Sequence, residues 1–134
     1  DEEFHQWIEP YDRRILETAR RAGLYNFLHI CKENLNMDRY KNYGDLVDVV
    51  NWGVYETEFP LEAGRQLFPK AAIMGGLANR SGVLVNGSSE EIGGAVRKVI
   101  EEFGRTGFIL GADCTLPTEM DYDRIRAAVQ ATMI

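Results

Sequence analysis

His29 and Cys31 lie two residues apart in the stretch NFLHICKEN (26–34), at the end of a short apolar run. The chain has only two histidines and two cysteines, so half of both scarce types meet here. Alternate residues of a strand point to the same side, so both side chains can face one ligand. The other cysteine, Cys114, follows an apolar run late in the chain. Two thiolates and an imidazole suit Zn²⁺, and its open fourth position can hold a substrate thiol as a nucleophilic thiolate.

The same residues also have a plainer interpretation. A single His-x-Cys spacing is a weak signal, and cysteine is among the most buried residue types of folded proteins. Spacing alone therefore leaves both a zinc site and a buried cysteine open. The remaining histidine, His5, lies in the leading helical segment, where we expect a surface role.

The elements that must position these residues alternate between apolar runs and amphipathic segments. Continuous apolar runs predict four strands, at residues 24–30, 47–53, 70–76 and 106–114. Helices are predicted over residues 2–22, where Pro10 opens the second part, and over residues 60–68. Two more are predicted, one after the capping pair Ser88 and Glu91 and one after a cap at Asp121 or Asp123. Residues 35–47 are helical or irregular. Continuous apolar strands are typical of parallel sheets buried on both faces. We therefore expect an α/β fold, with a leading helix and four β/α units in a single domain, residues 1–134.

Two architectures share this order of elements. One is an open doubly wound sheet, and the other is half of a (β/α)₈ TIM barrel, a fold that needs about 250 residues when complete. In both, functional residues gather at the carboxyl ends of the strands. If the sheet curls as in a barrel, the first and fourth strands face each other, and Cys114 can then reach His29 and Cys31.

Acidic residues follow two of the predicted strands. Glu56 and Glu58, in VYETEF after the second strand, offer a fourth metal ligand or a general base, although a solvated loop carboxylate explains them as well. Asp113, beside Cys114, either orients a metal ligand or caps a turn. We take Glu56 and Asp113 as the candidate catalytic residues.

Four residues at strand ends are candidates for substrate binding. Trp52 can stack on a flat substrate or pack at the barrel end. Gly75 and Gly76 allow a ligand close to the backbone or simply form a turn. Arg80 can pair with a carboxylate or phosphate of a substrate, or form a structural ion pair.

Composition limits the class of protein. With 45% hydrophobic and 27% charged residues the chain is an ordinary globular domain, and no apolar run approaches the roughly 18 residues that span a bilayer. The net charge of −6 repels phosphate backbones, so we expect no nucleic-acid partner. The acidic opening DEEFHQW is unlike a secretory signal, so we expect a cytoplasmic protein with reduced thiols and no membrane association.

Five stretches of the chain together match the sequence of a known family: PYDRRILETARRAG (10–23), FLHIC (27–31), DVVNWG (48–53), IMGGLANRSGVLVNGSSEEI (73–92) and GFILGADCTLPTEMDYDRIRAAV (107–129). Through them the chain resembles the uroporphyrinogen decarboxylase superfamily along almost its whole length and in the family's order. Members are (β/α)₈ barrels of well over twice this length, and the chain looks like their C-terminal half, from the fourth helix through strands five to eight. The resemblance thus favours the half barrel over the doubly wound sheet.

The resemblance implies one of two activities. Decarboxylases of the family need no metal or cofactor and bind a tetrapyrrole with the help of a late histidine, whose matching position here holds Cys114 in DCTLPTEMD. The cobalamin-dependent methyltransferases carry a zinc motif of His-x-Cys and one distant cysteine, which His29, Cys31 and Cys114 match residue by residue. The glycine usual after His-x-Cys is replaced by Lys32.

The resemblance thus favours a zinc-dependent methyltransferase, with a methyl-corrinoid as co-substrate, usually carried by a partner protein, and a small-molecule thiol as acceptor. The alternative is the metal-free decarboxylation of uroporphyrinogen III, a tetrapyrrole of porphyrin biosynthesis. A third reading is an inactive half barrel. A half barrel exposes two sheet edges and part of its core, so we expect two copies to pair in a homodimer or larger homo-oligomer.

Overall fold

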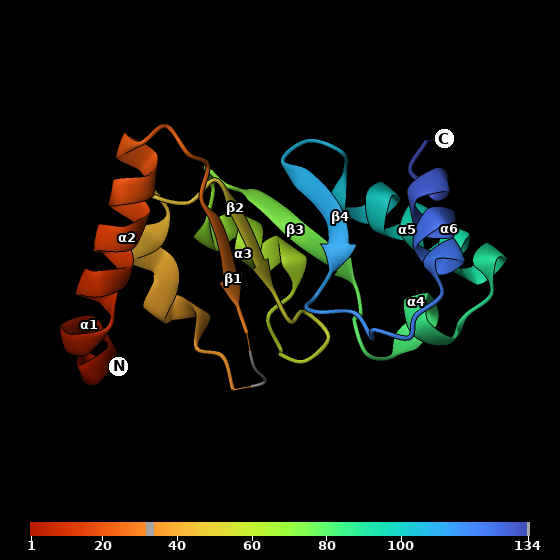
Figure 1. The fold of residues 1–134 in the computed structure, drawn as a ribbon, viewed down its shortest axis with the longest axis horizontal. Helices are drawn as coiled ribbons and strands as arrows, with labels where there is room; N and C mark the ends of the chain where they lie inside the picture. The colour runs from red at the N-terminus through yellow and green to blue at the C-terminus, as the bar shows by residue number, and fades with distance from the viewer. Residues whose placement is uncertain (32–33, 134) are drawn as a thin grey trace.

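A computed structural model describes residues 1–31 and 34–133, so Lys32 lies outside the described part. Helices and strands alternate along the chain (Figure 1). In chain order the elements are α1 (Glu2–Trp7), α2 (Glu9–Arg21), β1 (Phe27–Ile30), the 3₁₀ helix η1 (Met37–Tyr43), β2 (Val49–Trp52), α3 (Leu61–Leu67), β3 (Ala72–Leu77), α4 (Gly82–Asn86), α5 (Ser89–Phe103), β4 (Phe108–Ala112) and α6 (Tyr122–Ala131).

The strands form one sheet in the order β1-β2-β3-β4, and every neighbouring pair is parallel. A doubly wound sheet reverses its strand order at a switch point, whereas a barrel adds each strand beside the one before it. The uniform order therefore decides between the two predicted architectures: the chain forms part of a (β/α)₈ barrel, with β1 and β4 at its open edges.

The two faces of the sheet differ in what covers them. One aligned row of residues packs into the core under the helices: Leu28, Val50, Ile73 and Phe108. The next row lies on the opposite face, which points to the interior of a closed barrel: His29, Asn51, Met74 and Ile109. On that face His29 and Ile109 are exposed to solvent. Figure 1 accordingly shows α3 behind the sheet, and α5 and α6 beyond β4.

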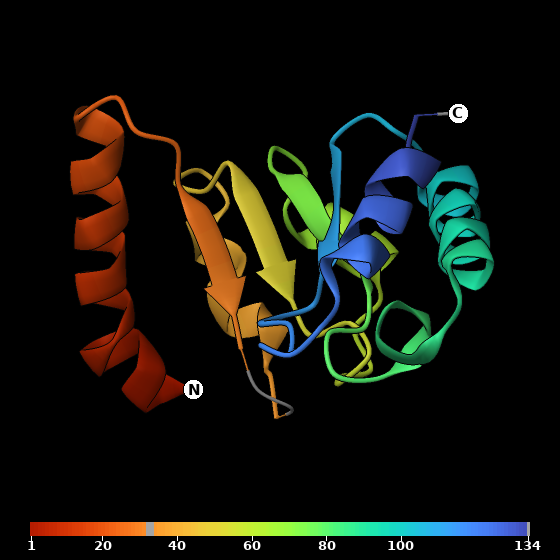
Figure 2. The ribbon, with the colours of Figure 1, turned by 45° about the vertical axis from the view of Figure 1, so that its right-hand side comes forward.

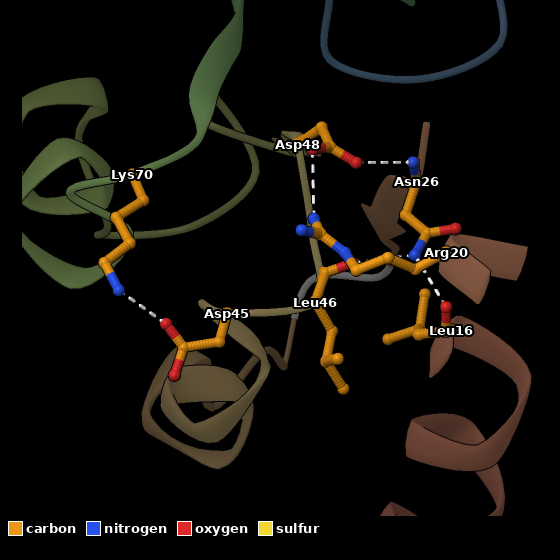
Figure 3. A network of polar contacts seen from close by, with 7 residues as sticks. All are labelled: Leu16, Arg20, Asn26, Asp45, Leu46, Asp48 and Lys70. Atoms are coloured by element: carbon orange, nitrogen blue, oxygen red, sulfur yellow. Dashed lines mark hydrogen bonds and ion pairs between the residues drawn. The ribbon is translucent and has the colours of Figure 1, made fainter. Parts of the chain in front are cut away.

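A polar network at the amino ends of the strands ties α2 to the sheet (Figure 3). The buried Asn26 donates through Nδ2 to the carbonyl oxygens of Leu16 (2.9 Å) and Leu46 (2.7 Å). Its backbone N–H donates to Asp48 (2.8 Å), whose other carboxylate oxygen accepts from Arg20 (3.0 Å). β1 begins at Phe27, directly after Asn26 and later than the predicted residue 24.

The helix boundaries follow the predicted signals, with one addition. Pro10 lies in the first turn of α2, and Ser88 and Glu91 form the reciprocal capping box at the start of α5. Asp121 caps α6 by accepting from the backbone N–H of Asp123 at 2.9 Å. The short helix α4 was not predicted, because five residues with two valines show no helical period.

Candidate metal centre

His29, Cys31 and Cys114 come together at the carboxyl end of the sheet. His29 lies in β1, Cys31 directly follows that strand, and Cys114 follows β4. The segment after β4 runs back toward the end of β1, which Figure 2 shows as the blue loop beside the orange strand. One ligand atom from each of the three residues lies within 4.8 Å of the other two. The curled sheet thus places the three side chains as the half barrel requires.

The spacing of the sulfur atoms can be tested against a metal. The two Sγ atoms are 3.7 Å apart, and both cysteines are free thiols. Two Zn–S bonds of about 2.3 Å at a tetrahedral angle place their sulfurs about 3.8 Å apart. A disulfide requires about 2.05 Å. The donor set and its spacing therefore fit Zn²⁺ with three protein ligands.

The cluster opens into a cavity of about 580 Å³ on the uncovered face of the sheet. The walls beside the three candidate ligands are mostly apolar: Asn51, Met74, Ala112, Thr115 and Leu116. His29 and Cys31 are exposed and Cys114 is half-buried. A ligand entering from the barrel interior can therefore reach the three candidate ligands, and no lysine or arginine of the described chain lines this cavity.

Hydrogen bonds lower the pKa of the Cys114 thiol to about 7. The largest contribution comes from the backbone N–H of Thr115, with smaller ones from the Thr115 hydroxyl, Cys31 and His29, while partial burial acts in the opposite direction. A thiol with this pKa is substantially ionised at neutral pH. Since metals bind the thiolate form, this lowers the cost of binding a metal there.

Asn51 is a member of the site that sequence reasoning missed. It lies beside His29 in the register of β1 and β2, and its side-chain oxygen is 2.6 Å from His29 Nδ1. The available signal was a single amide inside the otherwise apolar strand VVNW. Its importance depends on which residue of β1 it faces, and the strand register that decides this is not visible in the sequence.

Asp113 is buried, and it faces the loop after β2. Its Oδ2 accepts from the backbone N–H of Tyr55 at 2.7 Å, and its Oδ1 has no hydrogen-bond partner among residues 1–31 and 34–133. Burial raises the pKa of Asp113 to about 6, assisted by the negative charge of Glu56 and opposed by the Tyr55 hydrogen bond. Of the two predicted alternatives, the structure displays the turn-capping contact. Glu56 is exposed and does not line the metal cavity.

Replacing Asp113 with asparagine is expected to stabilise the metal-free protein at neutral pH by about 2 kcal/mol. The folded carboxyl has a pKa of about 6, above the ordinary value of 3.8, so the folded state binds more protons across that interval. The wild-type free energy of unfolding therefore falls as pH rises from about 3.8 to about 6. Below that interval the carboxyl is protonated in both states, and the cost of burying its charge is absent. Urea unfolding of both proteins between about pH 4 and 7.5 measures the difference in their free energies of unfolding, which should increase with rising pH. A difference that does not change with pH would show that it does not come from the charge of Asp113.

Comparison with protein families matches residues 1–133 to the family model of uroporphyrinogen decarboxylase (URO-D). The chain belongs to the uroporphyrinogen decarboxylase family. A search of curated proteins found no match. Among solved structures, a methyltransferase from Methanosarcina mazei superposes with a TM-score of 0.71 at 16% sequence identity. The match covers 97% of this chain and 36% of the methyltransferase, so this family member spans about a third of that protein's length. At this identity the likeness establishes the shared fold.

The predicted substrate-binding residues lie away from the cavity at the candidate metal centre in this family member. Trp52 is fully buried, donates from Nε1 to the Phe59 carbonyl oxygen (2.8 Å) and packs on α3, which is the packing role that the sequence left open for it. Gly75 and Gly76 are buried, and the Gly76 carbonyl oxygen accepts from the Tyr55 hydroxyl (3.2 Å). Arg80 is exposed after β3.

No helix among residues 1–31 and 34–133 is both long and apolar enough to cross a membrane.

Proposed function

We propose that the protein carrying this chain is a zinc-dependent methyltransferase that moves a methyl group from a corrinoid to a thiol held at His29, Cys31 and Cys114. The observation that carries the proposal is the convergence of one nitrogen and two sulfur ligands from the two edge strands, within 4.8 Å. Three protein ligands leave the fourth tetrahedral position to the substrate, which is the arrangement of catalytic zinc sites. The methyltransferase fold neighbour agrees with this activity.

The residues of this chain have defined tasks in such a reaction. Zinc bound there supplies a Lewis acid that keeps the substrate thiol ionised at neutral pH. Cys31 and Cys114 bring two negative charges, which leave the metal less electrophilic and the substrate sulfur more nucleophilic. The apolar wall of Met74, Ala112 and Leu116 keeps that sulfur poorly hydrated. The thiol proton would pass to solvent when the thiol binds, and the methyl–cobalt electron pair would stay on the corrinoid when the thiolate takes the methyl group.

The second candidate is the metal-free decarboxylation of uroporphyrinogen III, which the description of the family model favours. Against it stands Cys114, at the position where the resemblance to decarboxylases expects a histidine. The two activities make opposite predictions for Cys31→Ala. Decarboxylation would persist in this variant, whereas thiol methylation would be lost together with the metal.

The zinc content of protein purified under reducing conditions without chelator tests the proposal. We expect about one equivalent of zinc in the wild type, and nearly complete loss in His29→Ala and in Cys114→Ser. His5→Ala is the matched control, because His5 pairs with Glu9 in the leading helices and takes no part in the cluster. Methyl transfer from methylcobalamin to a small thiol should follow the zinc content across the four proteins. A wild type without zinc, or a His29→Ala variant with full zinc, would refute the proposal.

A further inference from the structure

We propose that Asn51 is a positioning residue that fixes His29 in one tautomer and one ring orientation, with Nε2 turned to the metal. This inference rests on the proposed metal site. The two residues are direct neighbours in the register of β1 and β2, on the uncovered face of the sheet. The Asn51 oxygen lies 2.6 Å from His29 Nδ1, which leaves Nε2 as the ring nitrogen available to a metal.

The orientation of the Asn51 amide follows from its other two contacts. Asn51 Nδ2 lies 3.0 Å from the carbonyl oxygen of Met74 and 3.2 Å from that of Ala112. A carbonyl oxygen only accepts, so the atom that faces both must be the NH₂ group, which has two hydrogens to donate. The opposite atom, which faces His29, must then be the oxygen.

This orientation determines the protonation of the imidazole. An amide oxygen only accepts, so the nitrogen that meets it, His29 Nδ1, carries a hydrogen. In a neutral imidazole the second nitrogen then has the lone pair, and that nitrogen is Nε2. Metal-binding histidines commonly donate from their other nitrogen to an oxygen acceptor, and this partner sets both the tautomer and the basicity of the ligand.

The same amide connects the parts of the sheet that carry the ligands. Asn51 lies in β2, accepts from His29 in β1, and donates to Met74 in β3 and Ala112 in β4. Ala112 precedes Cys114 by two residues, so one side chain links the strand of the histidine to the strand that leads to the second thiolate. Asn51 therefore acts on the metal through His29, without touching it.

Zinc affinity and the ¹⁵N NMR spectrum of His29 in the zinc-loaded protein test this role. The wild type should show a protonated Nδ1 and a metal-bound Nε2. Asn51→Leu removes the acceptor at similar size, and we expect zinc affinity to fall by about 10- to 100-fold, with loss of the single tautomer. Asn51→Asp keeps an oxygen beside Nδ1 and should retain the wild-type ¹⁵N pattern, but its second oxygen faces the carbonyl oxygens of Met74 and Ala112, so its stability and zinc affinity should fall as well. The matched control is Asn26→Leu, which removes a buried, doubly donating amide at the other end of the sheet and should lower stability but not zinc affinity.

The outcomes separate this inference from the proposed function. If the wild type binds no zinc, the proposed function fails. If the wild type binds zinc and Asn51→Leu binds it with equal affinity and an unchanged ¹⁵N pattern, the positioning role is refuted and the metal site stands. The role is also refuted if Asn51→Asp loses the single tautomer in the ¹⁵N spectrum as completely as Asn51→Leu, because the oxygen acceptor would then be irrelevant.

Discussion

Replacing Gly64 with alanine is expected to lower the free energy of unfolding by about 3 kcal/mol, a large part of the 5–15 kcal/mol typical of a domain. A Cβ at this position in α3 would lie 2.0 Å from the Trp52 ring, and two further ring atoms would be within 2.8 Å. Trp52 is fully buried and its Nε1 is bonded to the Phe59 carbonyl oxygen, so the ring cannot turn away without losing that bond. The helix must instead move off the sheet.

The matched control is Gly94→Ala in α5. Gly94 is exposed, and nothing lies within 4 Å of an added Cβ. The same change should therefore stabilise the protein by about 0.5–1 kcal/mol, because alanine is the better helix former. Urea unfolding of the two variants and the wild type measures both effects. A Gly64→Ala variant as stable as the wild type, or stabilised like Gly94→Ala, would contradict the close contact between α3 and Trp52.

The strands and their parallel arrangement were readable from the sequence, because the apolar runs are continuous and alternate with capped helices. Their exact ends were not. Leu46 and Val47 are buried just before β2, so the apolar run extends beyond the residues that pair with a neighbouring strand. The choice between barrel and doubly wound sheet depends on strand order, which the residue pattern alone leaves open and which the family resemblance indicated correctly.

The candidate site was also predictable only in part, because local patterns show which side of a strand a residue faces but not which strands lie beside it. Alternation along β1 indicated that His29 and Cys31 share a side, and barrel curvature brings Cys114 to them as expected. For Trp52 the sequence left both stacking on a substrate and packing open, because a tryptophan at a strand end can point to either face, and here it points into the core. Asn51 was missed because the strand register, which the sequence does not show, places it beside His29. Local patterns thus indicated the three candidate ligands, while tertiary pairing determined what surrounds them.

Bound zinc is expected to protect the two thiols from peroxide, slowing their loss at least about tenfold relative to the metal-free protein. In the metal-free protein the Sγ atoms of Cys31 and Cys114 are 3.7 Å apart, close enough to form a disulfide with a small movement. Hydrogen bonds hold the pKa of Cys114 at about 7, so its thiolate is the expected first nucleophile. It attacks one peroxide oxygen and releases hydroxide, forming a sulfenic acid. The Cys31 thiol then attacks this sulfur, forming the disulfide and releasing water.

Thiol titration and the intact mass follow this reaction. The metal-free protein should lose both thiols together and two hydrogens in mass, since the chain has only these two cysteines. Cys31→Ser is the matched control: it keeps the reactive Cys114 but should stop at the sulfenic acid or its further oxidation products, with oxygen added. Cys114 is already substantially ionised without metal, so zinc adds little thiolate and mainly withdraws electron density from the two sulfurs. The zinc-loaded wild type should therefore keep its thiols, while the Cys31→Ser protein given the same zinc lacks one ligand and should not. Equal rates of thiol loss with and without zinc would mean that the metal does not bind through these sulfurs.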